Sequence, residues 1–154
     1  MVYEWVPTVD ESRITKGAML LDAALSPDGS ALVLLERLGV KGGPFGSRII
    51  VFDLLGRSIV AAPAFLKNRF ERILPVAGEA AKVIALETRR DGARLVLLDL
   101  ASGALGAESE AFPAEVGDIR ERGDKICVLP GGAAELLIFD GKDLAGAPER
   151  VKLE

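Results

Sequence analysis

The stretch SRIIVFDLLGRSIVA, residues 47–61, contains an apolar run, an aspartate, a short turn and a second short run. The same order returns in ARLVLLDLASGALGA, residues 93–107, and in AELLIFDGKDLAGA, residues 134–147. The marker aspartates of the three stretches are Asp53, Asp99 and Asp140. They lie 46 and 41 residues apart, close to the period of about 40–45 residues of a four-stranded repeat. The sequence therefore predicts three repeats of one structural unit.

Each unit also has an earlier half, made of two apolar runs joined by a polar turn. These halves cover residues 20–36, 72–87 and 116–129. Short runs rich in Val, Ile and Leu, bounded by Gly, Pro or Asp, are typical of strands and too short for most helices. In the first turn, Pro27 fixes φ, Asp28 can bond to the backbone two residues on, and Gly29 tolerates positive φ. We therefore predict an all-β chain with four antiparallel strands in each unit.

The turn Ser26-Pro27-Asp28-Gly29, the apolar strand after it and the later run Ile49–Asp53 resemble the repeat of TolB-like and WD-type β-propellers. The resemblance covers about residues 18–148 and is closest in the first repeat. It implies one domain, residues 1–154, with three propeller-like blades at about 18–63, 70–107 and 115–148. Residues 1–8, which include Tyr3 and Trp5, could supply an additional strand that closes a blade.

Three blades do not complete a ring, because propellers typically have about 4–8 blades. An open arc exposes two apolar end faces, which soluble monomers rarely do. Two arcs related by a two-fold axis bury both ends at once. We therefore expect half of a six-bladed propeller that assembles as a homodimer. The alternatives are a different subunit in place of the second copy, a structural fragment of a larger envelope or secreted protein, or a β-sandwich, which would not require the repeat.

The composition argues against several classes of function. The 154 residues carry a net charge of −4, which disfavours a nucleic-acid partner. The chain has no His, the commonest general base and metal ligand, so we expect no metal and no cofactor. No apolar run reaches the ~20 residues of a transmembrane helix, so no membrane insertion is expected. The N-terminus lacks signal-peptide features, which favours a cytoplasmic location, and Leu153-Glu154 resembles a vector-derived tail.

The search for catalytic motifs favours a protein that is not an enzyme. No serine lies in a nucleophile motif, and Cys127 is expected to pack in the core. The marker aspartates are expected to bond to turn amides rather than to hold a metal. The Gly-rich residues 39–46 lack the phosphate-loop pattern and predict a long hairpin loop. The alternative is a propeller hydrolase or lyase that uses channel carboxylates, with Asp22, Glu71 and Asp118 as candidates.

The predicted strand order places the loops between second and third strands, and the connections between blades, at one end of the sheets. In the first two blades these segments are rich in basic residues, which could steer a protein or an anionic partner. The predicted partner-binding residues are Arg37, Lys41, Phe45, Lys67, Arg69, Arg89 and Arg90. The function expected from the sequence is a non-enzymatic protein-interaction or ligand-binding module.

Overall fold

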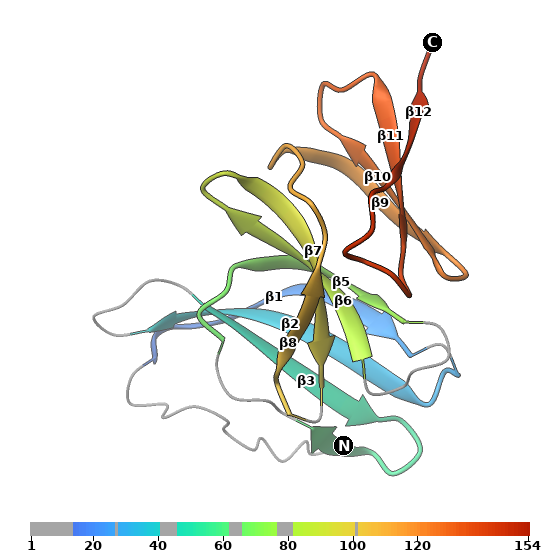
Figure 1. Ribbon diagram of the computed structural model, residues 1–154. Coiled ribbons are helices and arrows are strands. Elements are labelled where there is room, and N and C mark those ends of the chain that lie inside the picture. The colour runs from blue at the N-terminus through green and yellow to red at the C-terminus, as the bar shows by residue number, and fades with distance from the viewer. Residues whose placement is uncertain (1–13, 27, 41–45, 62–65, 77–81, 101) are drawn as a thin grey trace.

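The computed structural model describes residues 14–26, 28–40, 46–61, 66–76, 82–100 and 102–154. The described residues form three four-stranded antiparallel sheets, in which the strand order follows the chain (Figure 1). Sheet 1 contains β1 (Ile14–Leu25), β2 (Ala31–Val40), β3 (Gly46–Asp53) and β4 (Ser58–Ala61). Sheet 2 contains β5 (Phe70–Pro75), β6 (Lys82–Arg89), β7 (Gly92–Asp99) and β8 (Leu105–Glu108). Sheet 3 contains β9 (Val116–Arg122), β10 (Lys125–Pro130), β11 (Glu135–Asp140) and β12 (Glu149–Lys152).

Sheet 2 is buried on both faces, because alternate residues of its central strands enter two different cores. Val83 and Ala85 of β6 pack against sheet 1, and Ile84 and Leu86 pack against sheet 3. Side chains on a strand point alternately to the two faces, so a strand buried on both sides must be apolar at nearly every position. This explains the continuous apolar run in β6. The all-β fold with three four-stranded, propeller-like blades is the one predicted from the sequence.

The first strand of every sheet contains a bulge at the same place. In each first strand, one extra residue has no partner, while the residues before and after it pair with two consecutive residues of the second strand. The extra residue is Leu21 in β1, Glu71 in β5 and Gly117 in β9. A bulge bends the strand and re-aims the side chains that follow it. The matching registers make the residues of the three sheets equivalent one by one. Leu35, Leu86 and Leu129, for example, pair with Asp22, Arg72 and Asp118.

The turns have the chemistry that the sequence indicates. Gly29 has φ 71°, and Asp28 Oδ1 accepts a hydrogen bond of 3.0 Å from Ser30 N, while Pro27 lies outside the described residues. The third strands end at the marker aspartates, and each aspartate accepts a backbone hydrogen bond from the turn after it. The donors are Leu55 N and Gly56 N for Asp53, Ser102 N for Asp99, and Lys142 N for Asp140. The predicted capping role of these aspartates is therefore confirmed.

Some elements differ from the sequence-based expectation. The outer strand of sheet 3, Glu149–Lys152, lies beyond the predicted limit at residue 148. Leu144, which looked like part of a strand, is 3% exposed and packs in the core between sheets 2 and 3 from within a turn. Leu153 N donates to Ala134 O, as Leu66 N and Phe112 N donate to Ser47 O and Ala93 O in the sheets before it. Leu153 therefore has a defined place in the repeat.

Cys127 is half-buried on the face of sheet 3 that points away from sheet 2, so the expectation of a core cysteine is wrong. Its neighbours Ile126 and Val128 face the core instead, because side chains alternate along β10. Among the described residues, no helix is long and apolar enough to cross a membrane.

Candidate functional site

The connections between sheets run beside the start of the third strands, at one end of the molecule. Leu66 forms a bridge with Ser47, and Phe112 forms a bridge with Ala93. The Ser47 hydroxyl also donates to Asn68 O at 2.8 Å and accepts from Phe70 N at 3.2 Å. The described parts of the inter-sheet connections therefore lie at the end of the sheets where the second strands end and the third strands begin, as predicted. We call this end the loop face.

Arginines predicted to bind a partner on the loop face are engaged in ion pairs. Arg37 Nη2 lies 2.8 Å from Glu71 Oε2, and Arg69 Nε lies 2.8 Å from Glu71 Oε1. Lys67 and Arg90 are exposed, and no ion pair of theirs is described within the ranges that the structure covers. Lys41 and Phe45 lie outside the described residues.

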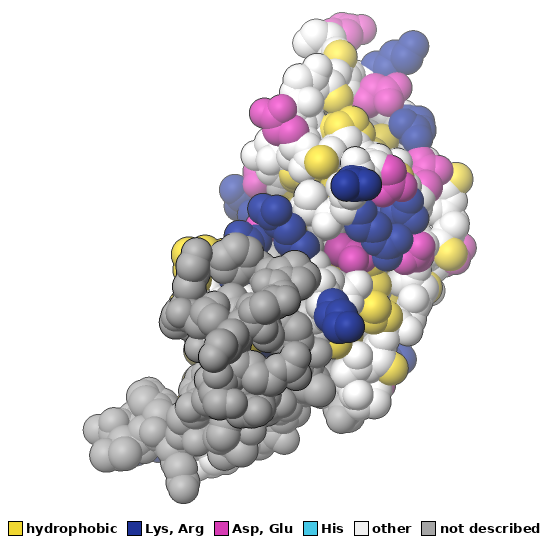
Figure 2. All heavy atoms as spheres, turned by 90° about the vertical axis from the view of Figure 1, so that its left-hand side faces the viewer, with side chains coloured by type: hydrophobic (Ala, Val, Ile, Leu, Met, Phe, Trp, Pro, Cys, Tyr) yellow, Lys and Arg dark blue, Asp and Glu magenta, His cyan; other side chains and the backbone are white. Residues whose placement is uncertain are grey.

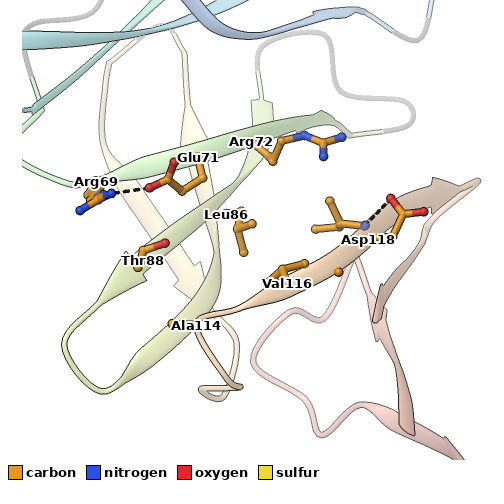
Figure 3. Close-up of a pocket in the computed structure, with 10 residues that line it drawn as sticks. Arg69, Glu71, Arg72, Leu86, Thr88, Ala114, Val116 and Asp118 are labelled. Carbon is orange, nitrogen blue, oxygen red and sulfur yellow. Dashed lines mark hydrogen bonds and ion pairs between the residues drawn. The ribbon is translucent and has the colours of Figure 1, made fainter. Parts of the chain in front are cut away.

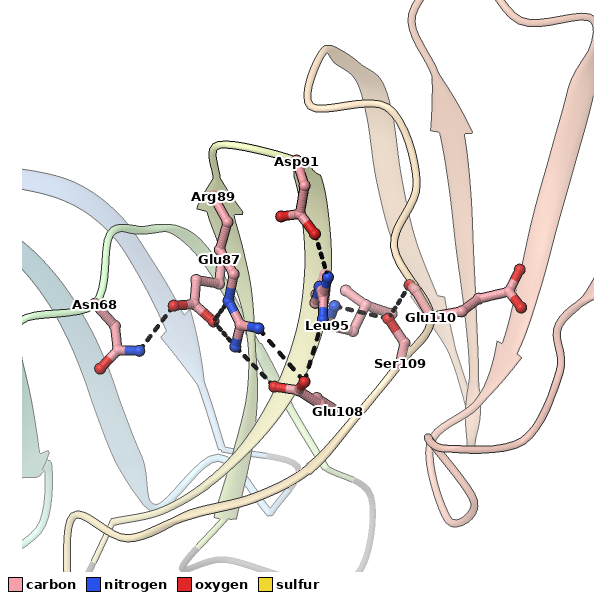
Figure 4. A network of polar contacts seen from close by, with 9 residues as sticks. Asn68, Glu87, Arg89, Asp91, Leu95, Glu108, Ser109 and Glu110 are labelled. Carbon is pink, nitrogen blue, oxygen red and sulfur yellow. Dashed lines mark hydrogen bonds and ion pairs between the residues drawn. The ribbon is translucent and has the colours of Figure 1, made fainter.

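Arg89 belongs to a network that spans three strands of sheet 2 (Figure 4). Its guanidinium bonds to Glu87 Oε2 at 2.8 Å and to Glu108 Oε2 at 2.7 Å. Glu87 is only 4% exposed and accepts a further bond of 2.7 Å from Asn68 Nδ2. Glu108 also accepts a bond of 3.2 Å from Arg94, which pairs with Asp91 in turn. Arg89 thus neutralises a buried carboxylate, so reversing its charge would disturb folding.

The electrostatics of this network follow from its hydrogen bonds. The bonds to Glu108 and Glu87 raise the pKa of Arg89 above its ordinary value. The hydrogen bond from Arg89, with the charges of Arg89 and Arg94, lowers the pKa of Glu108. On the side of the molecule shown in Figure 2, Lys and Arg side chains lie among Asp and Glu side chains. The loop face is therefore a mixed surface rather than a uniformly basic one.

A hollow of about 440 Å³ opens between the first strands of sheets 2 and 3 (Figure 3). Leu86, Val116 and Ile119 supply apolar walls. Arg69, Glu71 and Thr88 lie toward one end of the hollow, and Arg72 and Asp118 lie toward the other. A cleft with apolar walls and a few polar groups is the usual form of a small-ligand site. We call this cleft the inter-sheet hollow.

The inter-sheet hollow arises because small residues replace large ones between sheets 2 and 3. In the junction of sheets 1 and 2, Phe70 is fully buried, and Arg37 and Glu71 form an ion pair. The bulge registers make four positions of the two junctions equivalent. In the second junction, Val116 replaces Phe70, Gly117 replaces Glu71, Thr88 replaces Arg37 and Ala114 replaces Asn68. Each replacement removes side-chain volume.

The carboxylates proposed for an enzyme all have structural partners. Asp22 Oδ2 accepts from Ile73 N at 2.9 Å and from Arg72 Nε at 3.3 Å. Glu71 binds two arginines, and Asp118 Oδ2 lies 3.0 Å from Arg120 Nε. Hydrogen bonds from Arg120 and Ile119 N, with the charge of Arg72, lower the pKa of Asp118. A general acid needs a raised pKa, so Asp118 suits that role poorly. No cluster suited to a metal ion occurs among the described residues.

The outer face of sheet 1, which points away from sheet 2, has the residue pattern of a junction between sheets. It carries a second hollow of about 310 Å³, with apolar walls apart from Glu36. Leu20 is equivalent to Phe70, and Leu54 is equivalent to Leu100. Phe70 and Leu100 are 0% and 2% exposed in the core between sheets 1 and 2, whereas Leu20 and Leu54 are 58% and 39% exposed.

The outer face of sheet 3 shows the complementary pattern. By the same registers, its residues are equivalent to those with which sheet 2 packs against sheet 3. The outer residues are Cys127, Leu129, Leu136 and Ile138, in place of Ile84, Leu86, Leu95 and Leu97. All four outer residues are only half-buried. The outer faces of sheets 1 and 3 thus have the side chains of a buried junction, but no other described sheet packs against them.

The sequence matches no known protein family, and no curated protein matches it. Solved structures with a similar fold include hydrazine synthase from Kuenenia stuttgartiensis, at 15% identity and a TM-score of 0.49, over 88% of this chain and 54% of that one. BamB from Moraxella catarrhalis aligns at 15% identity and TM-score 0.40, over 85% and 48% of the two chains. A putative 6-phosphogluconolactonase from Bacteroides uniformis aligns at 9% identity and a TM-score of 0.43, over 89% of this chain and 56% of that one. The chain spans about half the length of each.

Proposed function

We propose that the chain is a non-enzymatic interaction or ligand-binding module that assembles as a homodimer, in which two three-bladed arcs form a six-bladed ring. The observation that carries this proposal is the pattern of the two outer faces. The outer face of sheet 1 has side chains equivalent to those with which sheet 2 packs against the sheet before it. The outer face of sheet 3 has side chains equivalent to those with which sheet 2 packs against the sheet after it. A two-fold pairing of identical chains joins the two kinds of face twice and leaves no apolar end exposed.

The loop face, with the inter-sheet hollow at its inner edge, is the proposed site for a partner or ligand. Lys67 and Arg90 extend into solvent there, and the hollow offers apolar walls with charged groups at both ends. These groups fit a partner of mixed polarity better than a strongly anionic one, because Arg37 and Arg69 are both paired with Glu71, and Arg89 is paired with Glu87 and Glu108. The paired inner carboxylates favour binding over catalysis.

The decisive experiment is the solution mass, measured by size-exclusion chromatography with light scattering at micromolar concentrations. The wild-type chain should elute at twice its chain mass of 16.3 kDa. Leu54→Glu should shift the mass to that of one chain, because it places a charge in the apolar contact of the outer face. Leu55→Glu is the matched control, since Leu55 is 87% exposed and is not part of the hollow on that face. A wild-type chain that remains monomeric contradicts the proposal.

The single thiol offers an independent readout of the same assembly. Cys127 lies on the outer face of sheet 3, which the ring would bury against the first sheet of the second copy. Its reaction with a thiol reagent such as DTNB should therefore be slower in the wild-type chain than in Leu54→Glu. Equal rates in the two proteins, with a dimeric wild type, would show that the dimer uses a different surface.

A further inference from the structure

The first strands of the three sheets carry a row of charges with alternating sign. Asp22, Arg72 and Asp118 occupy equivalent positions, each directly after a bulge. Asp22 reaches from sheet 1 to sheet 2, where it binds Arg72 Nε and Ile73 N. Arg72 in turn acts on Asp118 of sheet 3 through its charge. Along the arc, each member of the row is therefore stabilised by a residue of opposite charge.

Two residues further along these strands lies a position that faces the following sheet. In sheet 1 it is Ala24, which packs in the core shared with sheet 2. In sheet 2 it is Leu74, which is 6% exposed in the core shared with sheet 3. In sheet 3 the position is occupied by Arg120, whose side chain is 80% exposed. A charged group at this position is thus found only in the sheet that ends the arc.

Closure of the ring would bring two carboxylates together, and Arg120 lies where it can bind both. By the order of the row, Asp118 would lie beside Asp22 of the second copy, as Asp22 lies beside Arg72 within the chain. Two neighbouring carboxylates repel each other and oppose assembly. Arg120 Nε is already 3.0 Å from Asp118 Oδ2, on the side that would face the second copy. Its guanidinium has further N–H groups available to a second acceptor.

We propose that Arg120 closes the charge row by binding Asp22 of the second copy, and that this contact makes the ring-closing junction specific for another copy of this chain. The inference rests on the proposed homodimer. The contact occurs twice in each dimer, once at each junction. Arg120 is therefore a determinant of partner choice, whereas the apolar residues of the outer faces supply the contact area.

A double-mutant cycle on the full chain tests this contact. The dimer dissociation constant is measured by analytical ultracentrifugation for the wild type, Arg120→Ala, Asp22→Asn and the double variant. Asparagine keeps an acceptor for Ile73 N, so the fold of the inner strands is retained. Arg120→Ala should raise the dissociation constant about tenfold, and the double variant should lose much less than the product of the single effects. The Arg120 effect should also shrink at high salt.

The matched control is Lys142→Ala, which removes an exposed cation from the side of sheet 3 that faces sheet 2. It should leave the dissociation constant within about twofold of the wild-type value. If the wild type is a dimer and Arg120→Ala behaves like Lys142→Ala, the Arg120 contact is overturned while the ring survives. The Arg120 contact is also overturned if the double variant raises the dissociation constant by the full product of the two single effects. A monomeric wild type overturns the proposed function and the contact together.

Discussion

Replacing Phe70 with valine should loosen the well-filled junction between sheets 1 and 2 at one of the four positions where the junction between sheets 2 and 3 has a smaller residue. Phe70 is 0% exposed and lies in the core that the first two sheets share. Valine is the residue that sheet 3 has at the equivalent position, Val116. The substitution therefore tests whether the inter-sheet hollow results from side-chain volume at this position.

The size of the effect follows from the atoms removed. Valine has four side-chain carbons fewer than phenylalanine, and a buried methylene contributes about 0.8 kcal/mol, so the transfer loss is roughly 3 kcal/mol. The cavity left behind adds to this loss and local collapse reduces it, which gives an expected range of about 2–4 kcal/mol. The reverse change, Val116→Phe, should stabilise the chain by about 1 kcal/mol, because it fills space that is open in the wild type.

Urea unfolding, followed by circular dichroism, measures both changes. The proposed dimer would add to stability by mass action, so wild type and variants are compared at the same protein concentrations. The midpoints should shift in opposite directions with unchanged slopes. A loss below about 1 kcal/mol for Phe70→Val, or a marked loss for Val116→Phe, would refute the equivalence of the two positions.

Three further substitutions test the turns that join the strands. Asp28→Asn removes a carboxyl group whose pKa is lowered to about 2 by hydrogen bonds from Ser26 and Ser30. Since the folded-state pKa lies below the ordinary 3.8, the stabilisation is complete above about pH 4 and is lost toward pH 2. Thermal melts across that range should therefore depend less on pH in the variant, and equal pH profiles would contradict the assignment. Gly92→Ala should cost about 2–4 kcal/mol, since Gly92 has φ 139° and a Cβ there would lie 2.5 Å from Phe112 O. Gly123→Ala, with φ 62° and no atom within 4 Å, should cost only about 1 kcal/mol in the same urea assay.

The strands and turns could be predicted because their signals are local. The marker aspartates bond to amides only two or three residues away, and the turn at Asp28 is set by its own residues. Strand β12 was harder to place because Leu144 is apolar for a reason outside its own segment. It fills the core between sheets 2 and 3 from within a turn. Hydrophobic pattern alone does not distinguish that position from a strand residue.

The candidate site could be predicted only in part, because its contacts join residues far apart in sequence. The partners Arg37 and Glu71 are 34 residues apart, and Arg89 and Glu108 are 19 apart. The sequence shows these charges but not their distances, so the loop face looked more basic than it is. The inter-sheet hollow depends on the bulge in each first strand. A strict two-residue alternation through that bulge would assign the residues beyond it to the wrong face.

The three repeats separate what holds the fold from what distinguishes this chain. The bulges, the capping aspartates and the bonds made by Leu66, Phe112 and Leu153 recur in every sheet, so they belong to the scaffold.

The positions where the repeats disagree are of another kind. The position of Phe70 is occupied by Val116 in sheet 3, where the hollow opens. The position of Ala24 and Leu74 is occupied by Arg120 in sheet 3, where the arc ends. A scaffold alone gives no reason for a smaller residue in a core or for a charge on a face that has the residue pattern of a junction. The proposed ligand site would account for the first change, and the proposed contact with a second copy would account for the second. These two positions are therefore where substitutions should alter binding and assembly while the recurring scaffold contacts remain in place.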